Sequence, residues 1–187
     1  MKIGRFALVI AAAVAQTLNV AGEPKPKVPP RFEDYPATEV FARKPAPPKI
    51  VRSSQRRYQT RIREGVEKGW GVYRDGLNQA KPGPNFAGDM IFIQWSCGPP
   101  CLMAALVNAR TGEVYNPPLA VDGTFGLPLL VVGNSVGQNA ELEFRENSRL
   151  MIVSATPNWF KKHARSYRHY FVWESNQWRL IYKEPFD

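Results

Sequence analysis

The sequence predicts a mainly β (α+β) fold, an antiparallel β-meander or sheet with one N-terminal amphipathic helix packed on it. Three observations support this prediction. Short apolar runs recur between turn residues, which is typical of strands. One stretch near the N-terminus repeats apolar residues at the spacing of a helix face. The turns between successive runs are short, and short turns favour antiparallel neighbours.

Residues 1–22 are typical of a secretion signal. Lys2 and Arg5 form a positive segment, and an uninterrupted apolar run follows from Phe6 to Ala15. This run is too short for a membrane span, which needs about 20 apolar residues. Cleavage after Gly22 would leave a signal of normal length. We therefore expect a periplasmic or secreted protein with no integral membrane span after signal removal.

The mature chain is expected to be basic. Removal of residues 1–22 would leave 23 basic and 16 acidic side chains, a net charge of +7. This balance favours an anionic polymer as partner, such as lipopolysaccharide, a cell-wall polymer or nucleic acid. A soluble protein with a basic pI explains the same balance. The remaining length suits one domain with its own core.

Residues 23–50 form a proline-rich segment, which predicts an extended arm because proline fixes φ and removes a hydrogen-bond donor. Phe32, Tyr35 and Phe41 lie within it and suggest that its second half follows the surface of the domain. Residues 51–187 are expected to form a single β-rich domain.

The predicted helix begins with a cap at Ser53 or Ser54, runs to about Lys68 and ends at Gly69. Its apolar stripe consists of Tyr58, Ile62 and Val66. Arginine and glutamate occupy the rest of its surface, which indicates either a solvated basic face or an anion-binding face.

The predicted strands follow a loop that extends to Gly88. Asn108–Gly112 predicts a hairpin turn with Gly112 in the left-handed conformation, and Glu174–Gln177 predicts a second hairpin. A further helical turn or two is predicted near Asn158–Arg165. The strands are Met90–Trp95, Leu102–Val107, Glu113–Tyr115, Leu127–Val132, Glu141–Arg145, Arg149–Val153, Tyr167–Trp173 and Trp178–Tyr182.

Cys97 and Cys101 are the two cysteines of the chain, separated by Gly98, Pro99 and Pro100. A chain bound for an oxidising compartment is expected to join them in a disulfide. Closing so small a loop adds roughly 2 kcal/mol on the chain-entropy model, so the bridge would chiefly pin a turn between two central strands.

Two alternatives to a structural disulfide remain open. The run from Trp95 to Met103 superficially resembles the thioredoxin active site, which would make the pair a periplasmic thiol-redox site. The spacing of three residues and the early stop at Gly112 count against that reading, since the active thiol needs a long helix behind it. The same spacing can chelate Cu(I), with His163 or His169 as further ligands.

No catalytic residue, cofactor or metal site is predicted. Gly133–Gly137 matches the G-x-S-x-G pattern of a nucleophile elbow, but that elbow needs a helix after the serine. The sequence that follows alternates as a strand does. We interpret this segment as a glycine-rich turn.

Three strings in the chain resemble a family of small exported bacterial proteins of unassigned function. They are Asn85-Phe86-Ala87-Gly88, Trp95-Ser96-Cys97-Gly98 with Cys101, and Ala109-Arg110-Thr111-Gly112-Glu113-Val114-Tyr115. Pro45–Pro48, Asn147–Val153 and Tyr170–Glu174 fit the same pattern, so the resemblance extends from Pro45 to Ile181. The chain departs from the family pattern at Asp89, Ser96 and Pro99-Pro100. The resemblance implies export and a disulfide turn, and it implies no activity.

These observations predict a non-enzymatic exported envelope protein, a binding module of an inhibitor, immunity or structural type. Its partner is expected to be an envelope protein or an anionic polymer. Rigid prolines and aromatic side chains on a pinned turn suit recognition, because little conformational entropy is lost on contact. The candidate binding surface consists of Asn85, Phe86, Trp95, Gly98, Pro99, Pro100 and Tyr115.

Overall fold

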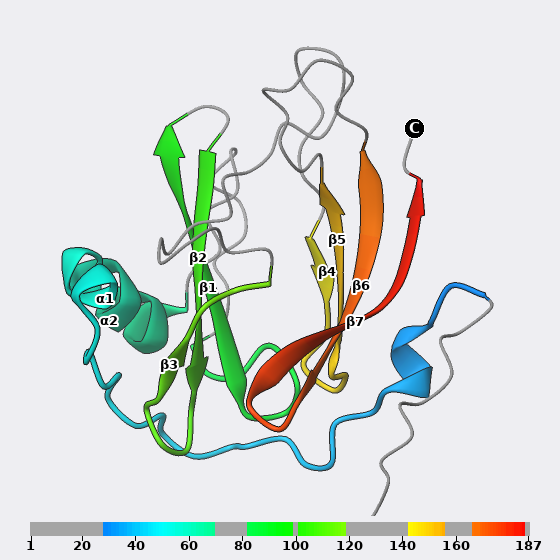
Figure 1. Ribbon diagram of the computed structural model, residues 1–187. Coiled ribbons are helices and arrows are strands. Elements are labelled where there is room, and N and C mark those ends of the chain that lie inside the picture. The colour runs from blue at the N-terminus through cyan, green and yellow to red at the C-terminus, as the bar shows by residue number, and fades with distance from the viewer. Residues whose placement is uncertain (1–27, 70–81, 99–100, 119–141, 156–165, 186–187) are drawn as a thin grey trace, which may run out of the picture.

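The strands form two antiparallel sheets that face each other, and two short helices cover the outer side of one of them (Figure 1). The computed structural model describes residues 28–69, 82–98, 101–118, 142–155 and 166–185, without the side chains of residues 96–98, 101, 102 and 155. Within this part of the chain, the mainly β class predicted from the sequence is confirmed.

The first sheet has three strands in the order β1-β2-β3. Strand β1 (Met90–Gly98) pairs with β2 (Cys101–Asn108), and β2 pairs with β3 (Val114–Tyr115). The turn before β3 closes through Gly112, whose φ of 76° confirms the predicted left-handed position. Strands β1 and β2 are apolar on both faces because each face packs against another layer.

The second sheet has four strands, each paired with the next one in the sequence. The strands are β4 (Leu142–Phe144), β5 (Leu150–Ala155), β6 (Tyr167–Glu174) and β7 (Gln177–Pro185). Ser175 and Asn176 join β6 to β7 with φ values of 48° and 60°. Two left-handed residues match the twist of a two-residue hairpin, so the predicted turn at this position is confirmed.

The main core lies between the two sheets. The rings of Phe92 and Phe144, one from each sheet, lie 5.1 Å apart in an edge-on arrangement. Because each sheet contributes one face to this core, the two sheets form one folded unit. The buried residues of the core are Phe86, Met90, Phe92, Ala104, Leu106, Met151, Val153, Phe171 and Trp173.

The helices α1 (Ser53–Arg57) and α2 (Gln59–Lys68) cover the outer face of the three-stranded sheet. Ile62 and Val66 of α2 are buried there, as the sequence pattern predicts. Gly65 allows the close approach of the helix, since a Cβ atom at this position would overlap the side chain of Ile93.

The predicted single helix is divided at Tyr58, and the prediction of a serine cap is wrong. The residue at the N-cap position is Arg52, and both serines already belong to α1. The cap function belongs to the side chain of Gln55, whose Oε1 accepts hydrogen bonds from the backbone N–H groups of Val51 and Arg52 at 2.8 and 3.0 Å.

Gln55 takes this role because it is fully buried and must bond all its polar atoms. Its Nε2 donates to the carbonyl oxygen of Val114 at 3.2 Å, which fixes the start of the helices to β3. The predicted end of the helix is confirmed at Gly69, where φ is 69°.

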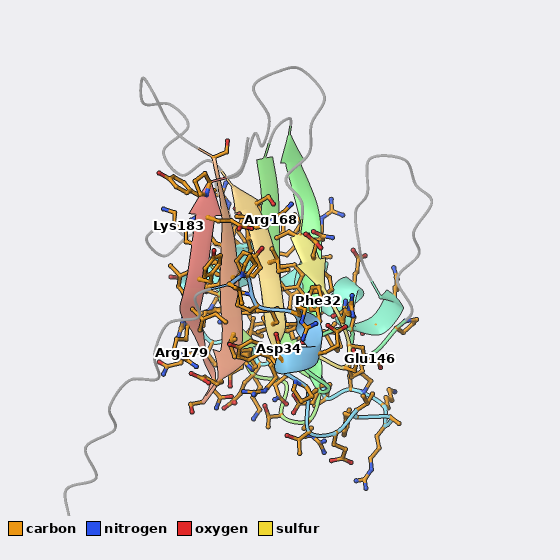
Figure 2. All side chains as sticks on the ribbon, turned by 90° about the vertical axis from the view of Figure 1, so that its right-hand side faces the viewer. Phe32, Asp34, Glu146, Arg168, Arg179 and Lys183 are labelled. Carbon is orange, nitrogen blue, oxygen red and sulfur yellow. The ribbon has the colours of Figure 1, made fainter. Side chains whose placement is uncertain are left out.

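The arm, residues 28–50, follows one end of both sheets (Figure 1). Its helical turn η1 (Phe32–Asp34) lies over the outer face of the four-stranded sheet, where Phe32 and Tyr35 pack against the core of that face (Figure 2). From there the arm crosses to the three-stranded sheet and leads into α1. Its backbone bonds run from Arg149 N to Tyr35 O, Ala37 N to Asn147 O, Phe41 N to Gly88 O, Ala46 N to Ala109 O, and Lys49 N to Gly112 O.

Four predictions concern parts of the chain that the structure does not describe. They are the secretion signal, the strand Leu127–Val132, the G-x-S-x-G segment and the helical turns near Asn158–Arg165. Within the described residues, no helix has both the length and the apolar character that crossing a membrane requires.

Candidate functional site

The structure does not bring the predicted surface residues together on one exposed face. Phe86 is fully buried in the core between the sheets, whereas Trp95 is buried beneath the helices. These two side chains therefore lie on opposite faces of the three-stranded sheet. Gly98 ends β1, and Pro99 and Pro100 lie outside the described residues.

Phe86 and Trp95 are covered by aromatic residues from distant segments. The ring of Trp178 stacks on Phe86 with centroids 5.4 Å apart, and the ring of Tyr58 lies 5.5 Å from that of Trp95. Both residues stabilise the fold through burial and ring contacts. Their assignment to an exposed recognition surface is corrected accordingly.

Asn85 extends the edge of β1 with its side chain. Its Nδ2 donates to the carbonyl oxygen of Phe92 at 3.0 Å, and its Oδ1 accepts from the N–H of Phe92 at 2.7 Å. The amide thus forms the pair of bonds that a neighbouring strand would form. Its role in the described structure is to satisfy and close this strand edge.

Tyr115 is half-buried and holds its phenol proton. Its hydroxyl donates to Glu113 at 2.7 Å, and its ring packs edge-on against Trp173 with centroids 5.1 Å apart. Burial, followed by the hydrogen bond to the Glu113 carboxylate, raises the pKa of Tyr115 to about 12. The group is unsuited to proton transfer near neutral pH.

The two cysteines lie at the adjoining ends of paired strands. Cys97 is the residue before the end of β1. Cys101 is the first residue of β2, and its backbone pairs with Gly98. The register is irregular between Ser96 and Gly98. Cys101 therefore begins a strand, and the long helix that follows the first thiol in a thioredoxin site does not occur at this position. The side chains of Cys97 and Cys101, including the sulfur atoms, lie outside the described part of the structure.

Two of the sequence strings quoted above contain glycines whose carbonyl groups bind the backbone of the arm. Gly88 ends the first string, and its carbonyl oxygen accepts a bond from Phe41 N. Gly112 lies in the third string and accepts a bond from Lys49 N in the same way. A Cβ atom at Gly88 would overlap the carbonyl oxygen of Glu39, and one at Gly112 would overlap that of Pro47. These glycines are required by the architecture.

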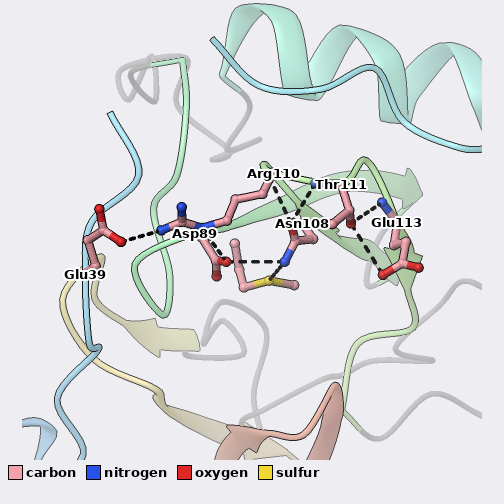
Figure 3. Close-up of polar contacts among 7 residues, drawn as sticks. Glu39, Asp89, Asn108, Arg110, Thr111 and Glu113 are labelled. Carbon is pink, nitrogen blue, oxygen red and sulfur yellow. Dashed lines mark hydrogen bonds and ion pairs between the residues drawn. The ribbon is translucent and has the colours of Figure 1, made fainter. Parts of the chain in front are cut away.

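Arg110 joins the arm to the turn before β3 (Figure 3). Its guanidinium pairs with Glu39 of the arm at 2.9 Å and with Asp89 at 3.2 Å. It also lies 4.9 Å from the ring centroid of Phe41, which adds a cation–π contact. Asn108 completes the network, since its Oδ1 accepts bonds from the backbone N–H groups of Arg110 and Thr111, each at 2.9 Å.

Two buried titratable groups of the second sheet, His169 and Tyr170, are hydrogen-bonded to neighbouring strands of that sheet. His169 is 3 % exposed, and its Nδ1 lies 3.3 Å from the carbonyl oxygen of Val153. Burial lowers the pKa of His169, so the ring is neutral at neutral pH. Tyr170 donates to Glu184 at 2.7 Å, and burial together with this bond raises its pKa to about 12.

No metal site is present in the part of the chain that the structure describes: no three His, Cys, Asp or Glu side chains are grouped so that they could hold an ion. His169, one of the two histidines considered for copper, lies inside the protein next to Phe171 and Tyr167. His169 is thus a packed residue of the second sheet.

The candidate site that the structure adds is a basic surface formed by the end of the arm and the two helices. Eight Lys and Arg residues occur between positions 43 and 63, and this stretch contains no Asp or Glu. All eight side chains are exposed. We call them the basic segment: Arg43, Lys44, Lys49, Arg52, Arg56, Arg57, Arg61 and Arg63.

The basic segment contrasts with the charges elsewhere in the described structure. On the four-stranded sheet, Arg145 pairs with Glu33 at 2.7 Å, and Arg149 lies 3.9 Å from Glu174. Positive and negative charges are thus interspersed there. The carboxylate that follows the basic segment along the chain is that of Glu64, which pairs with Lys68 at 3.6 Å. The positive potential is therefore concentrated over the helices and the end of the arm.

The sequence revealed part of this surface. The arginines of the helix are visible as a basic face, but Arg43, Lys44 and Lys49 fall in the proline-rich arm. The bond from Lys49 N to Gly112 O holds the end of the arm where it leads into α1 (Figure 1). The absence of acidic residues from 43 to 63 is the sequence signal that could have identified the whole segment.

Comparisons with known proteins give no relative for this chain: no protein-family model, no curated protein and no solved structure matches it. The site must therefore be interpreted from its own chemistry.

Proposed function

We propose that the chain is a non-enzymatic binding module of the bacterial envelope, periplasmic or secreted, which holds an anionic component against the basic segment. The observation that carries this proposal is the concentration of eight exposed cations on a stretch without a single carboxylate. Like charges held close together repel one another. An anion that binds to such a surface relieves this repulsion and lowers the free energy.

The support beneath the basic segment favours binding. Helix α2 is fixed to the sheet by Ile62 and Val66, and Gln55 fixes the start of the helices to Val114. The end of the arm is bonded at Ala109 and Gly112. The backbone under the cations is thus ordered before contact, which limits the entropy lost on binding.

The described titratable groups favour a binding role over catalysis. His169 and Tyr170 are buried and bonded inside the second sheet, and Tyr115 is bonded to Glu113. None of these groups has a pKa moved toward the value that acid–base catalysis at neutral pH requires.

The proposal includes a structural disulfide between Cys97 and Cys101. Their positions at adjoining ends of β1 and β2 support a clasp between paired strands. Purified mature protein treated with iodoacetamide without reductant should show no added mass, and after full reduction it should gain two adducts. A bridge that exchanges rapidly with dilute glutathione, or copper that copurifies, would favour the thiol-redox or copper reading instead.

The anion-binding function can be tested on immobilised polyphosphate. A variant with Arg56→Gln, Arg57→Gln and Arg63→Gln should elute at much lower salt than the unmodified protein. The matched control carries Arg31→Gln, Arg145→Gln and Arg179→Gln, which removes the same charge from ion-paired sites elsewhere. Equal weakening by both variants would show that only net charge matters, and it would contradict a site at the basic segment.

A further inference from the structure

The basic segment contains an exposed apolar side chain in its middle. Val51 is 67 % exposed and lies between Lys49 and Arg52 in the sequence, directly before α1. The neighbouring Ile50 packs against the core beneath the helices, so Val51 marks the outward side of the chain at this point. A soluble anionic polymer provides no apolar contact for such a side chain, whereas a lipid surface provides apolar contact next to its phosphate groups.

The basic segment does not present the aromatic rings that surfaces binding single-stranded nucleic acid use. Surfaces of that kind present aromatic rings on which bases stack. Tyr58 is the only aromatic residue between positions 43 and 63. Its ring is half-buried against Trp95 at 5.5 Å, and the Arg57 guanidinium lies 5.6 Å from its centroid. The segment therefore offers cations without a stacking platform.

The cations come from the end of the extended arm and from the two helices into which it leads (Figure 1). Six of the eight are arginines, whose planar guanidinium binds phosphate oxygens in pairs. Because the apolar face of α2 is occupied by the sheet, the helix cannot insert into a bilayer. The arrangement suits contact with an array of phosphate groups at a surface.

From these observations we infer that the basic segment binds the phosphate groups of an anionic lipid surface, with Val51 inserted among the headgroups. This inference rests on the proposed anion-binding function and specifies its partner. Each cation close to such a surface strengthens binding by about fivefold. The contact is peripheral: the protein lies on the lipid surface and leaves the bilayer uncrossed.

The test measures cosedimentation with vesicles of phosphatidylcholine alone and of phosphatidylcholine mixed with phosphatidylglycerol. The protein should bind the mixed vesicles and not the neutral ones. The variant with Arg56→Gln, Arg57→Gln and Arg63→Gln should bind the mixed vesicles about 100-fold more weakly. The variant with Arg31→Gln, Arg145→Gln and Arg179→Gln should bind nearly as well as the unmodified protein.

The variant Val51→Thr distinguishes binding to a lipid surface from binding to a soluble polymer, because it replaces a methyl group by a hydroxyl of similar size. It should weaken vesicle binding about fourfold and leave polyphosphate binding unchanged. Val28→Thr is the control, since Val28 is 70 % exposed and lies outside the basic segment.

The outcomes distinguish the inference from the proposed function. If Val51→Thr behaves as Val28→Thr does, or if duplex DNA binds more tightly than the mixed vesicles, the lipid inference is overturned while anion binding stands. If the arginine variant binds vesicles and polyphosphate as well as the unmodified protein does, both are overturned.

Discussion

At the scale of single residues, Gly88 and Gly112 determine whether the arm can lie on the sheets. Both have positive φ values, 81° and 76°, and both lie directly beneath a carbonyl oxygen of the arm. A side chain at either position meets two penalties at once, the left-handed backbone and the overlap with the arm. The second penalty is specific to the crossing arm.

Gly112→Ala should therefore destabilise the protein by more than the roughly 1–2 kcal/mol expected for a non-glycine residue in the left-handed region. Asn176→Ala is the control, since it also places alanine at a positive φ of 60°, but in an exposed turn. Urea denaturation of both variants gives the comparison. Equal losses would show that the arm does not rest on Gly112.

His169 links stability to pH. Burial holds its pKa below the ordinary value of 6.5, the charge of Lys183 adds to this effect, and the bond to Val153 opposes it. The unfolded chain then binds a proton at a higher pH than the folded protein does. The contribution of the neutral ring is complete above pH 6.5 and is lost as the pH falls toward the folded pKa.

The free energy of unfolding should consequently decrease between about pH 7.5 and pH 5.5, and His169→Gln should flatten that dependence. Urea denaturation at several pH values measures the slope. His163→Gln, the same substitution at the other histidine of the chain, is the comparison variant. A slope that persists in His169→Gln would assign it to other groups.

At the scale of elements, the contact between α2 and β1 depends on Gly65. Alanine at an exposed helix position is normally more stable than glycine by about 1 kcal/mol. At Gly65 the added Cβ would overlap the side chain of Ile93, so the helix would have to move away from the sheet. The sign of the effect thus reveals how closely the two elements pack.

Gly65→Ala should destabilise the protein, against the helix preference, by about 1–3 kcal/mol. In the background of Ile93→Ala, which removes the overlapping atoms, the same change should become neutral or stabilising. Thermal melts of the four proteins in this double-mutant cycle provide the measurement. Additive effects would exclude a direct contact.

The sequence was sufficient for elements that are defined by their own residues. The hairpin at Ser175 and Asn176 and the turn at Gly112 follow from local turn chemistry, and β1 and β2 follow from runs that are apolar on both faces. The helix start was not predictable in this way. Its cap depends on Gln55, whose burial is fixed by the distant carbonyl group of Val114.

The candidate site was the least predictable part for the same reason. Phe86 lies in the predicted loop that extends to Gly88, and Trp95 lies just before the predicted glycine–proline turn, which suggested exposure. In the folded chain Trp178 and Tyr58 cover these two side chains. Which aromatic side chains remain exposed is decided by contacts between remote segments, and no local pattern records those contacts.

At the scale of the whole molecule, the two sheets are joined by their common core and by a hydrogen bond from the four-stranded sheet to the segment that follows β3. Trp178 of β7 donates its Nε1–H to the carbonyl oxygen of Asn116, just after β3, at 2.9 Å. The same ring stacks on Phe86 and packs against Trp173 at 5.0 Å. Separation of the sheets would break both the bond to Asn116 and the stacking on Phe86, whereas the contact with Trp173 lies within the four-stranded sheet.

Trp178→Phe should lower the free energy of unfolding by about 1–2 kcal/mol, because it leaves the Asn116 carbonyl group without its donor. Fluorescence and far-UV circular dichroism should still report one common urea transition. Tyr115→Phe, which removes only the bond to Glu113 within the first sheet, is the control and should have a smaller effect. Two separate transitions would contradict a joint core.

The position of Ser148 has a consequence for biosynthesis. This buried hydroxyl donates to the carbonyl oxygen of Phe32 at 2.8 Å, across 116 residues of sequence. A nascent chain emerges with its N-terminus first, so the arm leaves the ribosome or a translocation channel long before the residues that receive it. Closure of the arm onto Ser148 therefore cannot precede synthesis of the C-terminal half, and we expect an incomplete polypeptide to remain open to proteases along the arm.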